Sequence, residues 1–313
     1  MRLWKLNIKT ASAPGKNPKQ FCLENSIMGV GWPISDSTEG ASQQTFLKAA
    51  NETYGTKKNH VPPGLRAMVE EVAIDDLVWT RDGSNIYYMG RVLSGWRYVV
   101  GAEPSKDWEG NNIHNIREVE WHKIGTAEAV PWGIRKQFSR GTLGGINKDG
   151  RAMLEFSKRL YHRLPSTAKH PGAPNYSTEE SSDKSFFALI GPDQCEDVVA
   201  LYLQHIHGYL LYPSTSKKTT KTYEYVLVHP GDGHRALVQV KSGVAALNRE
   251  VFQRLVETET TQPATKIYLF STDDRYAGIE DPRIECLSSK ELERFVHDNT
   301  NLMPRSVSIW LHR

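Results

Sequence analysis

The stretch YEYVLVHPGDGHRALVQVKSG, residues 223–243, decides the fold of the second half of this chain. Its first limb, residues 223–229, is rich in aromatic and β-branched side chains, and residues 235–241 form a second apolar run. Residues 230–233, Pro-Gly-Asp-Gly, lie between the two limbs and are typical of a tight turn. The segment is therefore predicted to be a β-hairpin.

The position of the turn sets which residues face each other across the hairpin. A turn centred between Gly231 and Asp232 places Glu224 beside Gln239. Side chains alternate along a strand, so Gln239 and Lys241 share one face. A carboxylate, a carboxamide and an ammonium group therefore converge, as metal-dependent phosphodiester hydrolysis requires: Mg²⁺ prefers oxygen ligands, and a lysine can position water. The alternative is a solvated edge hairpin with unrelated polar residues.

Composition bounds the class of protein. The chain has 313 residues, enough for two domains, and is 39% hydrophobic and 24% charged, which is typical of folded proteins. A net charge of +3 permits a nucleic-acid partner without demanding one. The three cysteines are widely spaced and lack CxxC motifs, which argues against disulfides and zinc sites. No apolar run approaches the roughly 20 residues of a membrane span, so we expect a soluble cytoplasmic protein without a membrane partner.

Residues 1–125 are predicted to form a small β-rich, barrel-like domain. They hold six of the eight tryptophans, and residues 76–80 and 86–92 flank a turn, which indicates a hairpin. Exposed tryptophan rings can stack on an extruded base while a polar group reads its edge. The candidates for base binding are Trp32, Trp79 and Trp96, with Asp82 as the edge reader. Ordinary core packing is the alternative for each ring, and most strongly for Trp79.

Four motifs in this region resemble the PUA-like superfamily. They are GVGWPI (29–34), DLVWTRD (76–82), YYMGRV (87–92) and GWRYV (95–99). Within that superfamily they look like the EVE and YTH-type domains. The resemblance implies an α+β domain with a PUA-like β-barrel over residues 1–125 that accepts a modified nucleotide in an aromatic cage. Trp32 best matches the loop tryptophan of such cages.

Residues 126–185 are predicted to be a basic helical connector and linker. Residues 125–164 carry eight basic and three acidic residues, and residues 151–164 have helical apolar spacing. Arg135, Lys136 and Arg140 are the candidate contacts to a DNA backbone. A solvated amphipathic helix is the alternative. Residues 165–185, rich in Pro and Ser, are predicted to be a flexible linker.

Residues 186–313 are predicted to be an α/β domain. A helix over residues 192–207 is followed by the hairpin, a helix over 244–256, a strand over 266–271 and a helix over 288–297. That order, with an acid on the first helix and Gln-x-Lys on the second limb, resembles the PD-(D/E)xK nuclease superfamily and its Mrr-like branch. The resemblance implies that Glu224 and Gln239 bind metal, that Lys241 is the catalytic lysine, and that Glu196 contributes to both the catalytic and the metal site.

Two neighbouring alternatives stay open in the sequence. Asp232 could replace Glu224 as the main metal ligand, but a strand position holds a ligand more rigidly than a turn, where aspartate is common. His229 and His234 flank the turn without an evident third ligand, so they are expected to be ordinary surface residues.

Together the two resemblances imply a modification-dependent endonuclease of a bacterium or archaeon. It would recognise a modified, methylated base in double-stranded DNA and cut with Mg²⁺, or with Mn²⁺ in its place. Because one such site cuts one strand, a homodimer on DNA is expected. The alternatives are an RNA-directed nuclease and a non-catalytic reader. The sequence leaves open which modification is recognised.

Overall fold

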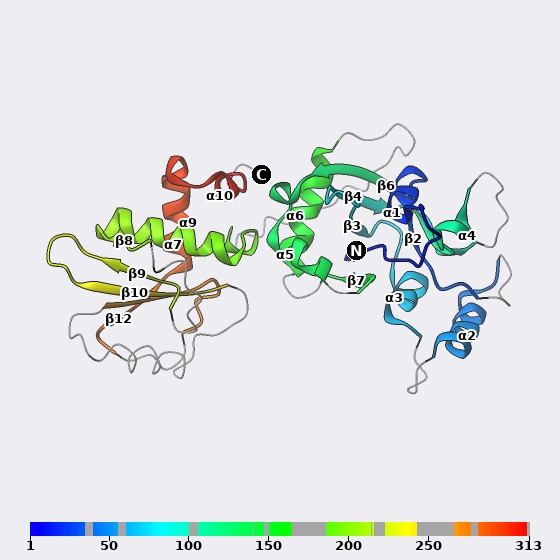
Figure 1. The fold of residues 1–313 in the computed structure, drawn as a ribbon, viewed down its shortest axis with the longest axis horizontal. Coiled ribbons are helices and arrows are strands. Elements are labelled where there is room, and N and C mark those ends of the chain that lie inside the picture. The colour runs from blue at the N-terminus through cyan, green and yellow to red at the C-terminus, as the bar shows by residue number, and fades with distance from the viewer. Residues whose placement is uncertain are drawn as a thin grey trace. The chain divides into compact units, whose positions relative to one another are not determined.

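The computed structural model describes residues 1–34, 40–55, 61–99, 106–139, 141–146, 150–164, 186–213, 215, 223–242, 266–276 and 281–311. These residues belong to two compact units, Met1–Glu180 and Ser181–Arg313, and each contains one sheet (Figure 1). The predicted linker over 165–185 and the predicted helix over 244–256 lie outside the described residues. Within the described part of the chain, no helix combines the length and hydrophobicity that a membrane span requires.

A seven-stranded sheet forms the centre of the first unit. Its strand order is β2-β6-β4-β3-β1-β7, and β5 also pairs with β6. The pair β1–β3 is parallel and the other pairs are antiparallel. The strands are β1 (Leu3–Leu6), β2 (Ile27–Val30), β3 (Leu77–Arg81), β4 (Tyr87–Val92), β5 (Arg97–Tyr98), β6 (Asn115–Gly125) and β7 (Leu143–Gly145). In the described residues the end strands, β2 and β7, do not pair with each other, so the sheet is open. It forms a curled half-barrel in a mixed α/β unit.

The predicted hairpin of the first unit is confirmed. Strands β3 and β4 pair from Leu77 opposite Arg91 to Arg81 opposite Tyr87. Asp82 builds the turn between them, since its Oδ1 accepts hydrogen bonds from two backbone N–H groups in the turn, at 2.8 and 3.0 Å. Its carboxylate is therefore committed to local structure.

Helices flank this sheet and extend beyond the predicted domain boundary. They are α1 (Pro18–Glu24), α2 (Gln43–Tyr54), α3 (Pro63–Arg66), α4 (Trp108–Asn111), α5 (Trp132–Arg135) and α6 (Gly150–Arg163). Helix α6 is bound to the sheet by polar contacts: Trp79 Nε1 donates to Ser157 Oγ at 3.0 Å, and the Tyr161 hydroxyl donates to Glu120 at 2.6 Å. The described residues of the predicted connector up to Leu164 therefore lie within the first compact unit.

The second unit is built on a five-stranded sheet of order β12-β11-β10-β9-β8. Its strands are β8 (Leu210–Leu211), β9 (Tyr225–Val228), β10 (Arg235–Lys241), β11 (Lys266–Ser271) and β12 (Ile284–Leu287). Strands β9 and β10 form the predicted hairpin in the predicted register, with Val228 opposite Arg235 and Tyr225 opposite Val238. Strand β10 is central, antiparallel to β9 and parallel to β11, and its interior residues are buried.

Helices α7 (Pro192–His207), α9 (Ser289–Asp298) and α10 (Arg305–Ser308) complete the described second unit, and α7 runs along the sheet (Figure 1). The predicted bounds of α7 are confirmed. Pro192 suits a first turn, and the Gly191 N–H donates to the Gln194 side chain at 2.6 Å. Gly208 ends the helix with φ 69°, a left-handed conformation that glycine adopts without strain. The Tyr225 hydroxyl donates to the Glu196 carbonyl at 3.1 Å and so ties the helix to β9.

We expect Gly90→Ala to destabilise the first unit, because β4 and β6 pack too closely for a methyl group at this position. A Cβ there would collide with the Val119 side chain and lie 2.7 Å from Trp121 Cε3. Overpacking of this kind costs about 1–3 kcal/mol. The matched control is Gly83→Ala, because a Cβ at Gly83 meets nothing within 4 Å.

Denaturation followed by tryptophan fluorescence measures this effect, because seven of the eight tryptophans lie between residues 4 and 132. Equal midpoints for the two variants would contradict the packing described here.

Candidate functional site

Three polar side chains meet at the open end of the β9–β10 hairpin. Gln239 Nε2 donates a hydrogen bond to Glu224 Oε1 at 2.5 Å. Lys241 Nζ lies 3.6 Å from the same oxygen. Gln239 is buried, whereas the Glu224 and Lys241 side chains are 25% and 35% exposed, so the cluster is reachable from solvent.

The backbone of the sheet holds this cluster in place. The Glu224 N–H donates to the Val238 carbonyl at 2.8 Å, which extends the ladder one residue beyond β9. Gln239 lies opposite Leu269 of β11 and shares a face with Leu237. Because β10 is paired on both sides, its side chains have little freedom to shift.

Glu196, in the first turns of α7, is electrostatically coupled to the cluster. Its pKa is raised to about 7, first by burial and then by the negative charges of Glu224, Asp193 and Asp197, while the positive charge of Lys241 acts in the opposite direction. As in a metal site, these acidic side chains place negative charge where burial disfavours the ionised form.

A hard divalent cation fits the groups present. Gln239 Oε1 is buried and accepts no hydrogen bond from any described residue. The Nε2 end of the carboxamide faces Glu224, so a half-turn of the carboxamide would bring Oε1 beside that carboxylate, and carboxylate and carboxamide oxygens are the ligands that Mg²⁺ prefers. Asp232 is not part of this cluster. It lies in the hairpin turn, where His229 and His234 contact it instead.

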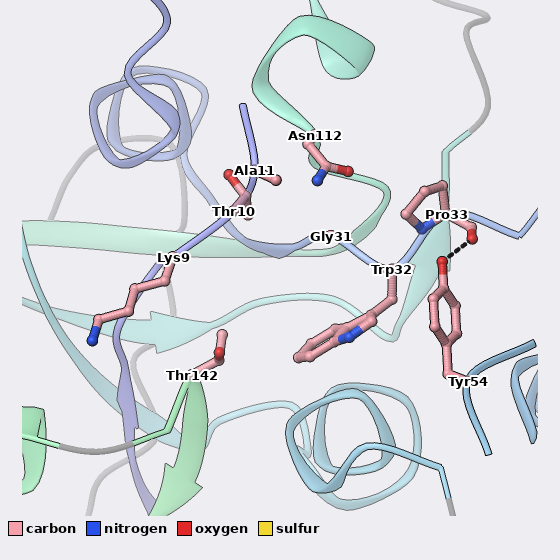
Figure 2. Close-up of a pocket in the computed structure, with 9 residues that line it drawn as sticks. All are labelled: Lys9, Thr10, Ala11, Gly31, Trp32, Pro33, Tyr54, Asn112 and Thr142. Carbon is pink, nitrogen blue, oxygen red and sulfur yellow. Dashed lines mark hydrogen bonds between the residues drawn. The ribbon is translucent and has the colours of Figure 1, made fainter. Parts of the chain in front are cut away.

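A pocket of about 290 Å³ lies in the first unit, and the Trp32 ring forms one of its walls (Figure 2). Figure 2 shows Trp32 between Lys9 at one end and Tyr54 at the other, with Asn112 above the ring and Thr142 on the Lys9 side of it. Its lining residues are Lys9, Thr10, Ala11, Gly31, Trp32, Pro33, Tyr54, Asn112 and Thr142.

Trp32 is held in an unusual backbone conformation. Its φ is 63°, which is costly for a bulky residue and is maintained only when its surroundings impose it. Asn115 supplies part of that constraint, because its Nδ2 donates to the Gly31 carbonyl at 2.6 Å and to the Trp32 carbonyl at 3.4 Å. Trp96 supports Asn115 in turn, donating from Nε1 to Asn115 Oδ1 at 3.1 Å. Trp96 thus lies behind the pocket wall and does not line the pocket.

The other two predicted base-binding residues lie elsewhere. Trp79 is fully buried, so its ring is not accessible to a ligand, and this part of the prediction is corrected in favour of core packing. The reason is tertiary: α6 covers β3 and offers Ser157 to the indole N–H. Asp82 stays at its own turn and does not line the pocket.

Sequence reasoning missed most of the pocket lining. Lys9, Tyr54, Asn112 and Thr142 come from segments far apart in the chain and match no motif. Tyr54 is oriented by its hydroxyl, which donates to the Pro33 carbonyl (Figure 2). Only the glycine-flanked position of Trp32 carried a signal that sequence analysis could use.

Positive charge gathers near the Lys9 end of the pocket. Burial lowers the pKa of Lys19, and the charges of Arg81 and Lys9 lower it further, while the Asp82 carboxylate raises it. Burial and the charge of Lys9 likewise lower the pKa of Lys5, whose Nζ donates to the Gly141 carbonyl at 2.8 Å. A bound polyanion would relieve the repulsion between these basic side chains.

The predicted backbone contacts are only partly accessible. Arg135 and Lys136 are half-buried, and the Arg135 guanidinium lies 5.3 Å from the centre of the Trp132 ring. Arg140 lies outside the described residues.

We expect Glu196→Gln to stabilise the second unit at pH 8 and to leave its stability unchanged near pH 4. The native carboxyl group has a raised pKa of about 7 against 4.5 in the unfolded chain. The folded state therefore binds more protons between these values, and stability falls as pH rises through that window. After a discount for solvent screening, the free energy of unfolding of Glu196→Gln at pH 8 should exceed that of the native protein by about 1 kcal/mol.

Calorimetric unfolding in EDTA between pH 4 and pH 8 measures the difference in stability between Glu196→Gln and the native protein. Asp298→Asn, which removes the same charge from an exposed position of α9, is the control. An identical shift at both pH values would contradict the raised pKa.

A family model described as a domain of unknown function (DUF8426) matches residues 4–147, a span that runs from β1 to just beyond β7. No curated protein matches the chain.

Two solved structures show low similarity to it. The restriction endonuclease MspJI in complex with a 27-mer oligonucleotide has a TM-score of 0.27 and 11% identity, covering 99% of this chain and 79% of that one. The DNA modification-dependent restriction endonuclease AspBHI has a TM-score of 0.22 and 11% identity, covering 98% and 84%. TM-scores this low do not establish a shared fold.

Proposed function

We propose that this protein is a metal-dependent endonuclease that cuts double-stranded DNA carrying a modified base. The observation that carries the proposal is the cluster of Glu224, Gln239 and Lys241 at the open end of one hairpin, with Glu196 coupled to it. A solvated edge hairpin would not bury Gln239 with an unpartnered oxygen, nor raise the pKa of a neighbouring acid to about 7.

Each residue has a role that its position supports. Glu224 would hold Mg²⁺, or Mn²⁺, together with the Gln239 carboxamide oxygen once the carboxamide has turned that oxygen toward Glu224, and Glu196 would be a further ligand once its proton has left. Lys241 would orient the attacking water and stabilise the charge that develops on the scissile phosphate. When bound, the cation supplies Lewis-acid polarisation of the phosphate and a nucleophile at neutral pH.

The pocket around Trp32 is the proposed site for the modified base. Its volume is close to the lower end of the range for small-ligand sites, about 300–1,000 Å³. An extruded base would stack on the Trp32 ring, and the Asn112 carboxamide offers both a donor and an acceptor for its edge. The basic side chains near Lys9 would neutralise the adjoining phosphates.

The proposed activity bears on the assembly and the cellular compartment of the protein. One such site cuts one strand at a time, so double-strand cleavage suggests two copies of the chain meeting on the DNA, and we propose a homodimer there. A cytoplasmic location in a bacterium or archaeon follows from the same proposed activity. An RNA substrate and a non-catalytic reader are distinguished from it by the experiment below.

The first test is cleavage of matched plasmids that are unmodified, cytosine-methylated, adenine-methylated or hydroxymethylated, with Mg²⁺ and with EDTA. We expect cleavage of one modified plasmid only, abolished by EDTA and reduced at least about 100-fold by Lys241→Ala, because that variant loses the group that stabilises charge in the transition state.

Lys266→Ala is the matched control. Lys266 lies on the adjacent strand and is 38% exposed, against 35% for Lys241, but it pairs with Glu285. Binding of modified DNA without cleavage would indicate a reader, and cleavage of a modified RNA alone would indicate an RNA-directed enzyme. Cleavage that persists in EDTA would contradict the proposed chemistry.

The second test concerns the pocket. We expect Trp32→Ala to abolish discrimination between modified and plain DNA while leaving non-specific binding within about threefold, because phosphate contacts do not depend on this ring. Trp121→Ala is the control, since Trp121 packs against the same core cluster but does not line the pocket. Competition binding with matched duplexes measures the ratio of the affinities for modified and plain DNA. Equal loss of discrimination in both variants would assign the effect to folding.

A further inference from the structure

The turn of the β9–β10 hairpin carries a second cluster of side chains that the proposed nuclease does not use. It consists of His229, Asp232 and His234, and one ligand atom from each lies within 4.8 Å of the others. Along the hairpin it is five residues from Glu224 and Gln239, roughly 17 Å at about 3.3 Å per residue. The two clusters are therefore separate sites.

The hairpin register brings the two histidines together. His229 lies across the ladder from His234, since its N–H donates to the His234 carbonyl at 2.9 Å. Their rings stack with centroids 5.1 Å apart and planes inclined by 17°. Gly233, with φ 73°, allows the chain to turn tightly enough for this pairing.

Asp232 lies between the two imidazoles. Its Oδ1 is 3.1 Å from His229 Nδ1 and 2.6 Å from His234 Nδ1, so both rings direct the same nitrogen at one oxygen. Without a cation, protons on the two nitrogens account for these contacts. The ligands of a tetrahedral zinc ion at about 2.0–2.2 Å lie roughly 3.3 Å from one another, so only small side-chain rotations separate this arrangement from a metal site.

A second layer of contacts orients His234 for coordination. The Tyr209 hydroxyl lies 2.7 Å from His234 Nε2, and its buried ring meets both imidazoles edge-on. Tyr209 is itself hydrogen-bonded to Tyr268. Ligating histidines almost always use the second nitrogen in this way, which fixes the ring and leaves Nδ1 available to the cation.

We propose that His229, Asp232 and His234 bind a borderline transition-metal cation of the Zn²⁺ class and so clamp the turn of the hairpin. Two imidazoles and one carboxylate favour such a cation over Mg²⁺, which prefers an all-oxygen site. The three side chains are 29–60% exposed, so solvent can supply the fourth ligand. The clamp does not depend on the nuclease activity proposed above.

Calorimetric titration of Zn²⁺ alone into the untagged full chain tests this proposal. The buffer holds millimolar MgCl₂ to occupy the oxygen-rich cluster, and Cys286→Ser serves as the background because Cys286 is an exposed free thiol. We expect one Zn²⁺ per chain and at least tenfold weaker binding in His229→Ala, His234→Ala and Asp232→Asn. Zn²⁺ should raise the melting temperature of the background protein but not of these three variants.

Two controls keep the outcome specific. His205→Ala removes an exposed histidine of α7 outside the cluster, and Glu224→Gln removes the acid of the other site; both should bind Zn²⁺ as the background does. Asp232→Asn tests the site even if a histidine variant fails to fold, because asparagine also suits this turn. Unchanged affinity in Asp232→Asn, or the absence of stoichiometric binding, would overturn the proposal. A loss confined to Glu224→Gln would assign the zinc to the other cluster.

Discussion

The register of the β9–β10 hairpin is the constraint on which both polar clusters of the second unit depend. With Tyr225 opposite Val238, Glu224 comes to lie beside Gln239 at one end of the ladder, and His229 lies beside His234 at the other. A slip of one residue would turn every side chain of β10 to the opposite face and separate both groups. Pairing with β11 on the other edge holds β10 in this register.

The cluster at the open end of the hairpin lowers stability where chemistry is proposed. Gln239 carries a buried oxygen without a hydrogen-bond partner, and Glu196 lies where burial and neighbouring acids disfavour its charge. Proteins commonly give up stability at functional sites, because groups arranged for a ligand are poorly arranged without it. The apolar contacts of Leu237, Val226, Ile267 and Leu269 on the same sheet offset part of that cost.

In the first unit, the packing holds an aromatic ring, that of Trp32, at the surface of a pocket. Trp32 packs against two core clusters and yet lines the cavity. Its left-handed backbone conformation is maintained by Asn115, and Asn115 by Trp96. Trp96, which the sequence suggested as a second stacking ring, thus acts through Asn115 on the loop that carries Trp32.

Local sequence signals determined the hairpin, its register and the bounds of α7. The turn residues 230–233, the alternation along each limb, and Pro192 with Gly208 all act within a few residues, so a short stretch of sequence is enough to place them. The convergence of Glu224, Gln239 and Lys241 followed from the same local rules.

Only the tertiary structure decided which tryptophans are accessible and which groups are coupled. Trp79 is buried because Ser157, 78 residues away, covers its indole, and the pocket is lined from several separate segments. The raised pKa of Glu196 likewise depends on burial and on Glu224 of another element. Burial and charge coupling arise between residues distant in the chain, and no local pattern records them.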